Sequence, residues 1–166
     1  VCSSDLIEDH IHKNRIDAAM SLVAKVPIAD RRVALYQDVL AGLQLPDDSD
    51  LLESLLPLLS ADVDSLSHIE TRLSTQLKVA SFLAQSSPET SLSRTQSVLE
   101  ELKGTPHFKS KDSLVETAIQ QLARLQEYDQ GLSAISQLST LENQAKALLT
   151  FPLFSPENPM IGRAHV

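Results

Sequence analysis

Apolar side chains recur along most of the chain at intervals of three and four residues, which is the spacing of one face of an α-helix. The longest stripe begins at Leu66 and ends at Ala84, and a second runs from Val115 to Leu125. No segment alternates between apolar and polar residues for long enough to predict a β-strand. The pattern therefore predicts an all-α fold, with helices over residues 7–13, 16–26, 29–43, 49–59, 65–85, 88–103, 111–125, 128–138 and 140–150.

Residues that cap helices stand at the start of several predicted elements. Ser87 precedes Pro88, which predicts an N-cap followed by proline at the first helical position. Ser139 and Glu142 have the spacing of a capping box. Pro57 is expected to interrupt the helix in which it lies, because proline lacks an N–H group and clashes with the preceding turn.

Several predicted helices share one pattern of residues. Residues 16–26 align without gaps with residues 92–102 and 128–138, and residues 49–59 form a weaker copy. The segments that follow the first and last copies are similar to each other as well. This alternation indicates an array of helical repeats. The residue type is shared at two of the aligned positions. The first holds a small residue, at Ala19, Thr95 and Gly131. The second holds a serine, at Ser21, Ser54, Ser97 and Ser133.

Residues 115–138 place small and apolar side chains where two packed helices would need them. These positions are Val115, Ala118, Ile119, Leu122, Tyr128, Gly131, Ile135 and Leu138. In this spacing the segment resembles a hairpin of the tetratricopeptide family, with Gln126 where that family usually has glycine. Residues 12–26 fit the turn and second helix in the same register, with Asn14 at the glycine position. The resemblance implies a right-handed α–α superhelix, or solenoid, of about four helical hairpins.

The resemblance also implies a concave face, lined by one helix of each hairpin, that binds a peptide or a partner helix. In this register the face carries Glu116, Gln120 and Arg124, at positions i, i+4 and i+8 of one helix. The corresponding earlier helix contributes Arg31 and Asp38. We expect these five residues to contact the partner. The alternative is that each belongs to a solvated helix face, which is the usual place of a charged side chain.

Composition narrows the possible ligands. The chain has 166 residues, of which 42% are hydrophobic and 4% aromatic, and four are glycine. These values suit one helical domain with a sizeable core. The formal net charge of -8 disfavours a nucleic-acid ligand, because such binding depends on clustered Lys and Arg. No apolar run is long enough to span a bilayer.

The sequence contains few residues that could bind a metal or catalyse a reaction. Cys2 is the single cysteine, which excludes an intrachain disulfide and a multi-cysteine zinc site. His10 and His12 point to opposite sides of a helix, and the pair of Glu8 and His12 lacks a third ligand. Motifs for a nucleophile elbow, a phosphate loop or a zinc protease are missing from the sequence. We therefore expect no metal, no cofactor and no enzymatic activity.

The two ends of the sequence are complementary when translated back into DNA. Residues 1–5 can be encoded by GTGTGCTCTTCCGAT, and residues 161–165 by its reverse complement, ATCGGAAGAGCACAC. Such a pair resembles a sequencing adapter read as protein at both ends of a fragment. We therefore expect residues 1–6 and 161–166 to be scars foreign to the protein.

The remaining chain would then be an internal piece of a longer array. It would hold one repeat domain over residues 7–154 and an irregular tail over residues 155–160, with adjoining repeats as neighbours. Phe151, Leu153 and Phe154 would lie beside a missing neighbour, so we expect exposed apolar surface and self-association. The compartment stays open, with the cytoplasm as the default.

The sequence favours a protein-interaction scaffold, because it offers helical repeats and no catalytic motif. One alternative is a structural or regulatory helical arm of a larger enzyme or signalling protein whose active domain lies elsewhere. A further alternative is an enzyme whose site is assembled across several helices.

Overall fold

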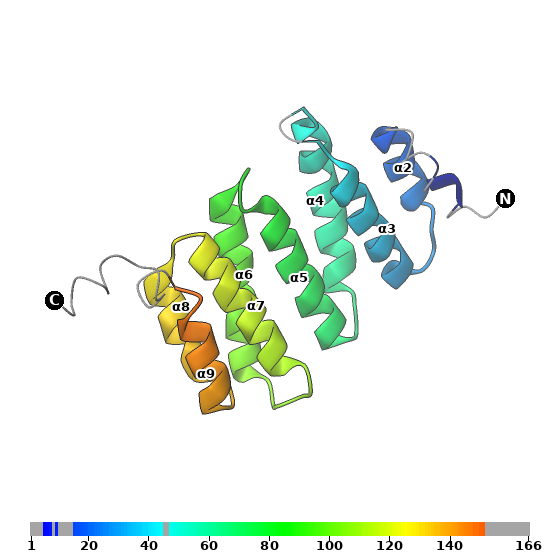
Figure 1. Ribbon diagram of the computed structural model, residues 1–166. Helices are drawn as coiled ribbons and strands as arrows, with labels where there is room; N and C mark the ends of the chain where they lie inside the picture. The colour runs from blue at the N-terminus through cyan, green and yellow to red at the C-terminus, as the bar shows by residue number, and fades with distance from the viewer. Residues whose placement is uncertain (1–4, 8, 10–14, 45–46, 152–166) are drawn as a thin grey trace. The chain divides into compact units, whose positions relative to one another are not determined.

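Figure 1 shows the computed structural model of the chain, which describes residues 5–7, 9, 15–44 and 47–151. Every regular element in these ranges is helical, so the all-α prediction is confirmed. The helix predicted over 7–13 lies mostly outside the described residues. The tail over 155–160, the C-terminal scar, Cys2, Leu153 and Phe154 lie outside them entirely. The chain divides into two compact units, residues 1–72 and residues 73–166.

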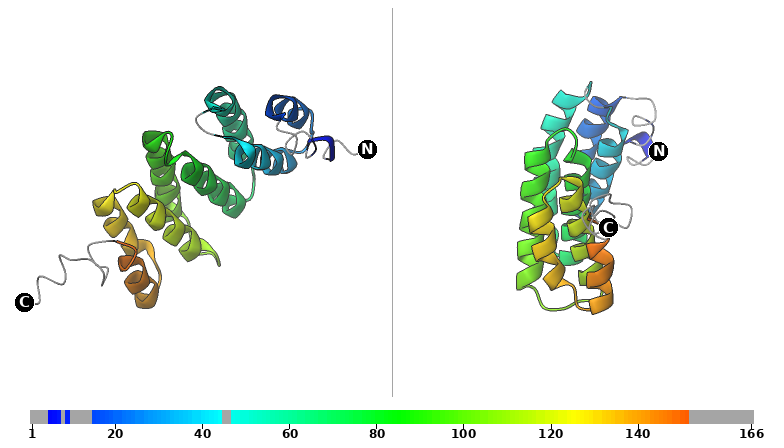
Figure 2. Two further views of the ribbon diagram at one scale, coloured as in Figure 1. Left: turned by 45° about the horizontal axis from the view of Figure 1, so that its top comes forward. Right: turned by 60° about the vertical axis from the view of Figure 1, so that its left-hand side comes forward.

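The first unit contains α2 (Ile16–Val23), α3 (Ala29–Gly42) and α4 (Ser49–Asp64), each of which contacts the other two (Figure 2). Their apolar residues fall at the spacing of one helical face, and those faces meet in the core. Burial of each large side chain contributes about 1.5–3 kcal/mol. The fully buried members are Ala19, Val23, Tyr36, Val39, Leu55, Leu59 and Val63.

Helix α4 continues through Pro57 to Asp64, so the prediction that Pro57 interrupts it is wrong. A proline in a helix leaves the carbonyl group four residues earlier without its donor. Here that carbonyl belongs to Glu53, and both Glu53 and Pro57 are exposed. The unpaired group therefore faces away from the core, where water can satisfy it.

Arg32 links α3 to α4 and to the loop before α3. Its Nε and Nη2 atoms donate to the Asp62 carboxylate at 2.8 and 2.6 Å, and its Nη1 donates to the carbonyl oxygen of Val26 at 2.7 Å. The hydrogen bond to Asp62 raises the pKa of the guanidinium. One side chain thus holds two helices and a loop together.

The helices of the second unit pack around α7 (Lys111–Arg124). Helix α5 (Ile69–Leu83) begins in the first unit and continues into the second. It is followed by α6 (Pro88–Gly104), α7 and α8 (Tyr128–Ala134). The chain then forms the 3-10 turn η1 (Ile135–Gln137) and α9 (Leu141–Leu148). Helix α7 contacts α6, α8 and α9, and buries Leu114, Val115, Ala118, Ile119 and Leu122 among them.

A buried polar network joins α5, α6 and α7. The Gln121 amide donates to the carbonyl oxygen of Ala80 at 3.1 Å and to Ser91 Oγ at 2.9 Å. Ser91 Oγ itself donates to the same carbonyl at 2.6 Å. Gln121 is only 5% exposed and the other two residues are fully buried, so water cannot replace these bonds.

Gln126 adopts a left-handed backbone conformation in the turn from α7 to α8. Its φ of 63° makes it the one positive-φ non-glycine residue in the described part of the chain. Glu127 N donates to Leu122 O at 2.9 Å and Gln126 N donates to Ala123 O at 3.0 Å. This pair of bonds is the Schellman arrangement, whose left-handed residue is usually glycine.

The start of α9 differs from the predicted capping box. Thr140, and not Ser139, is the N-cap, and its hydroxyl accepts from Asn143 N at 3.1 Å. Ser139 instead donates to Asp112 of α7 through both its backbone N–H and its hydroxyl. The Asn143 amide donates to the same carboxylate at 3.1 Å. Partial burial acts to raise the pKa of Asp112, but these hydrogen bonds outweigh it and lower the pKa.

Phe151 is fully buried, so the prediction that it lies beside a missing neighbour is wrong. Its ring packs edge-on against Tyr128, with ring centroids 6.1 Å apart and an interplanar angle of 81°. It also lies against Gly131 of α8. The chain that follows α9 therefore returns an aromatic side chain to the core of the second unit.

Candidate functional site

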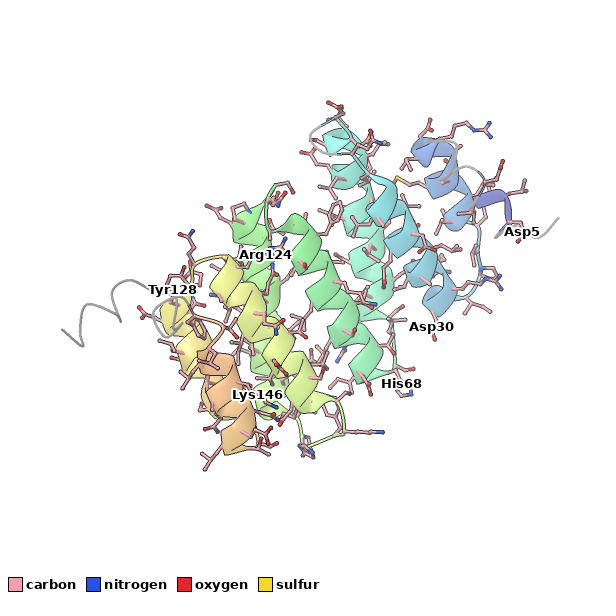
Figure 3. All side chains as sticks on the ribbon, in the orientation of Figure 1. Asp5, Asp30, His68, Arg124, Tyr128 and Lys146 are labelled. Atoms are coloured by element: carbon pink, nitrogen blue, oxygen red, sulfur yellow. The ribbon has the colours of Figure 1, made fainter. Side chains whose placement is uncertain are left out.

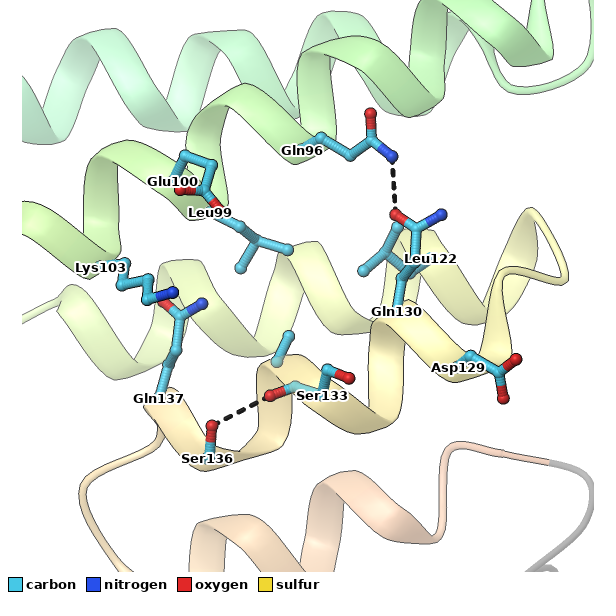
Figure 4. Close-up of a pocket in the computed structure, with 11 residues that line it drawn as sticks. Gln96, Leu99, Glu100, Lys103, Leu122, Asp129, Gln130, Ser133, Ser136 and Gln137 are labelled. Atoms are coloured by element: carbon cyan, nitrogen blue, oxygen red, sulfur yellow. Dashed lines mark hydrogen bonds between the residues drawn. The ribbon is translucent and has the colours of Figure 1, made fainter.

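A groove of about 370 Å³ lies in the second unit between α6 and the segment formed by α8 and η1 (Figure 4). Its apolar surface comes from Leu99 of α6, Leu122 of α7 and Ala134 of α8. All three are buried, so they form the floor. The remaining lining residues are polar: Gln96, Glu100, Lys103, Asp129, Gln130, Ser133, Ser136 and Gln137.

Carboxamide groups dominate the rim of the groove. Gln96 of α6 donates to the Gln130 oxygen of α8 at 2.7 Å, and this bond joins the two walls (Figure 4). Gln130 in turn donates to Glu127 at 3.0 Å. The amide oxygen of Gln137 is buried and accepts no hydrogen bond from any described residue. A buried acceptor without a donor is costly, which makes Gln137 a side chain that would gain by turning its amide oxygen toward a donor.

Charges stand on both walls of the groove. Glu100 and Lys103 project from α6, and Asp129 lies on α8 (Figure 4). Neither histidine nor cysteine is among the lining residues. The site thus offers hydrogen-bond donors and acceptors around a small apolar floor.

The five residues predicted to bind a partner fall in different units. Arg31 and Asp38 are exposed on α3 in the first unit. Glu116, Gln120 and Arg124 follow one face of α7 in the second unit, with Glu116 half-buried and the other two exposed. The structure thus brings the last three together on one helix face.

Two of those three side chains already interact within the chain. Arg124 donates to Ser81 Oγ of α5 at 3.1 Å. Lys146 of α9, labelled with Arg124 in Figure 3, pairs with Glu142 at 2.7 Å. The pKa of Lys146 is raised, with the largest contribution from Glu142 and a smaller one from the charge of Glu116. Gln120 is therefore the member of this set with the most available polar atoms.

The groove lies on the other side of α7 from the predicted face. Leu122, which forms part of the groove floor, is two residues from both Gln120 and Arg124, and a helix turns by about 200° over two residues. Sequence reasoning missed the groove because it depends on how α6 and α8 pack against α7. One signal was present: Ser133, a member of the repeated serine column, lies on its wall.

Further observations bear on the class of protein. In the described part of the chain, no three His, Cys, Asp or Glu side chains are placed to hold a metal ion together. Within the same ranges, none of the helices has the length and apolar character needed to cross a membrane. Comparison of the chain with protein-family models, with curated proteins and with solved structures found no match.

Proposed function

We propose that the chain is a protein-interaction scaffold that binds an extended peptide segment in the groove between α6 and α8. The observation that carries this proposal is the buried amide oxygen of Gln137, which has no donor among the described residues. A backbone N–H of a bound peptide would supply one once the Gln137 side chain turns its oxygen toward the groove. Giving this buried acceptor a donor favours binding by about 1–3 kcal/mol.

The chemistry of the lining favours an extended segment over a helix. An extended peptide has free N–H and C=O groups, whereas a helix bonds its own internally. The rim presents carboxamides on both walls, from Gln96, Gln130 and Gln137, which can both donate and accept. The floor, formed by Leu99, Leu122 and Ala134, has room for a small apolar side chain of the peptide.

Recurrent local geometry supports the proposal that the chain is a tetratricopeptide-like array of helical hairpins. In three interhelical connections, a side chain donates to the carbonyl oxygen of the residue six positions earlier. Each of these bonds joins a loop to the helix that follows it. The three bonds run from Arg32 to Val26, from Lys111 to Thr105 and from Gln144 to Leu138.

The aligned small residues also support an array. Ala19, Thr95 and Gly131 are all buried, as close packing between neighbouring helices requires. The proposal extends to a right-handed superhelix of about four hairpins, in which each hairpin buries its apolar face against the next. Gln120 of α7 and, separately, Asp38 of α3 are second candidates for contact with a partner, because both side chains are exposed. The groove ranks first, because Arg124 and Glu116 already interact within the chain.

The groove can be tested with a random peptide library displayed on phage and selected against the purified chain. Peptides recovered on the wild type are then measured against Gln137→Leu and against Gln120→Leu, the matched change on the opposite face of α7. We expect Gln137→Leu to weaken binding about tenfold, which corresponds to about 1.4 kcal/mol, and Gln120→Leu to leave it unchanged. The reverse ranking, or selection of no peptide, would overturn the proposal.

A further inference from the structure

Helix α9 presents an apolar stripe that no described helix covers. Leu141, Ala145, Leu148 and Leu149 follow one side of the helix, and Leu141 is 83% and Leu149 61% exposed. The other side of α9 is packed, because Ala147 is buried and α9 contacts α7 and η1. Contiguous exposed apolar surface, unlike a single exposed leucine, marks a site where another surface packs.

The corresponding side of α3 is covered by another helix, so α3 can be compared with α9. The bond from Gln144 to Leu138 O matches the bond from Arg32 to Val26 O, so residue 32 aligns with residue 144. In this register Leu148 corresponds to Tyr36, which is only 2% exposed. The Arg32 side of α3 is held against α4 through Asp62. A helix packed on the equivalent side of α9 would bury Leu148 as Tyr36 is buried.

We propose that α9 of a second copy of this chain occupies this surface, antiparallel to the first and related to it by a two-fold axis near Ala145. This proposal is independent of the peptide groove. Such an interface must be self-complementary, because each copy presents the same residues. The apolar stripe meets that requirement, since Leu141 of one copy comes opposite Leu149 of the other.

Charge complementarity selects the antiparallel arrangement. Glu142 and Lys146 stand one turn apart beside the stripe, and both are largely exposed. Reversing one helix brings Glu142 of each copy toward Lys146 of the other, whereas in a parallel two-fold pair these residues lie on opposite sides of the interface and do not meet. The two ionic contacts therefore favour the same alignment as the apolar residues.

The mass of the full chain in solution, measured by sedimentation velocity over a range of concentrations, tests the dimer. We expect a concentration-dependent dimer, and we expect Leu141→Ser with Leu149→Ser to weaken it about tenfold or more, since each change removes apolar contact area. Leu58→Ser on α4 is the matched control, because Leu58 is also exposed, at 43%. A chain that stays monomeric at all concentrations, or a dimer lost equally in the control, would overturn the proposal.

Charge reversal tests the alignment of the two helices. Lys146→Glu should weaken the dimer, and the double variant Glu142→Lys with Lys146→Glu should restore it, because the double change recreates both ionic contacts. Circular dichroism checks that each variant keeps the helical content of the wild type. A dimer indifferent to Lys146→Glu, or not restored by the double change, would show that another surface joins the copies.

A cysteine placed on the axis gives a direct readout. In a Cys2→Ser background, Ala145→Cys should form a disulfide-linked dimer under mild oxidation, because the two thiols face each other across the axis. Thr117→Cys, exposed on α7, serves as the control and should form no disulfide cross-link. Equal cross-linking of both variants, or none of Ala145→Cys, would contradict the antiparallel arrangement.

Discussion

The ring of Phe151 occupies the space that a side chain on Gly131 would fill. A Cβ atom built on Gly131 would lie 2.5 Å from Cζ and 2.6 Å from Cε1 of that ring. Both distances are shorter than van der Waals contact, so the ring fits in this position only because residue 131 has no side chain. Phe151 thereby closes the core at the end of the second unit, where Tyr128 contacts its edge.

We predict that Gly131→Ala lowers the free energy of unfolding by about 1–2 kcal/mol, because overpacking outweighs the better helix propensity of alanine. Chemical denaturation measures the change. Gly104→Ala is the matched control, since a Cβ atom there meets nothing within 4 Å. If Gly131→Ala is as stable as that control, the ring is not fixed by this contact. Pairing Gly131→Ala with Phe151→Leu tests the coupling between the two residues.

The network around Gln121 predicts a large penalty for its removal. Gln121→Ala should cost about 2–4 kcal/mol, because it opens a cavity and removes the donor to Ser91 Oγ. The neighbouring variant Gln120→Ala should change stability by less than about 0.5 kcal/mol, since Gln120 is exposed. Urea unfolding curves of the two variants provide the comparison. Equal stabilities would show that the network does not hold α5, α6 and α7 together.

The left-handed conformation of Gln126 predicts a stabilising substitution. Gln126→Gly should raise the free energy of unfolding by about 0.5–1 kcal/mol, because glycine adopts positive φ without a steric penalty. Gln126→Ala keeps the Cβ atom and should bring no gain. Thermal unfolding followed by circular dichroism distinguishes the two outcomes. A gain with alanine as large as with glycine would assign the effect to loss of the glutamine side chain.

The carboxylate of Asp112 predicts a pH dependence of stability. Its pKa is lowered in the folded chain by hydrogen bonds from Ser139 and Asn143, against the opposing effect of burial. The stabilisation is therefore complete above the pKa of the unfolded state, about 3.9, and is lost as the pH falls through the folded pKa. Unfolding curves between about pH 2 and 6 should show a shallower acid dependence for Asp112→Asn than for the wild type. An identical slope would contradict the assignment.

The positions of the helices could be predicted because the spacing of apolar residues is a local signal. Helix α6, for example, begins at Pro88 as expected and ends one residue beyond the prediction, at Gly104. The local rule failed at Pro57, because sequence alone does not show that the unpaired carbonyl of Glu53 faces outward. It failed again at Phe151, whose burial depends on a chain reversal after α9 and on the small residue at position 131.

The groove could not be predicted from the same pattern. Gln96 and Gln130 are 34 residues apart, and they meet because α6 and α8 both pack against α7. Helical periodicity identifies the face that each helix buries, but it does not say which neighbour covers that face or what space is left between two neighbours. The buried oxygen of Gln137 depends on that packing as well.

By itself, the sequence determined the helical class and most helix boundaries, because these depend on interactions within a few residues. The tertiary structure alone decided that Gln121 is buried with Ser91, that Phe151 lies on Gly131, and that a polar groove opens on the side of α7 away from Gln120. These features depend on contacts between residues distant in the chain, whose geometry is set by the packing of whole helices.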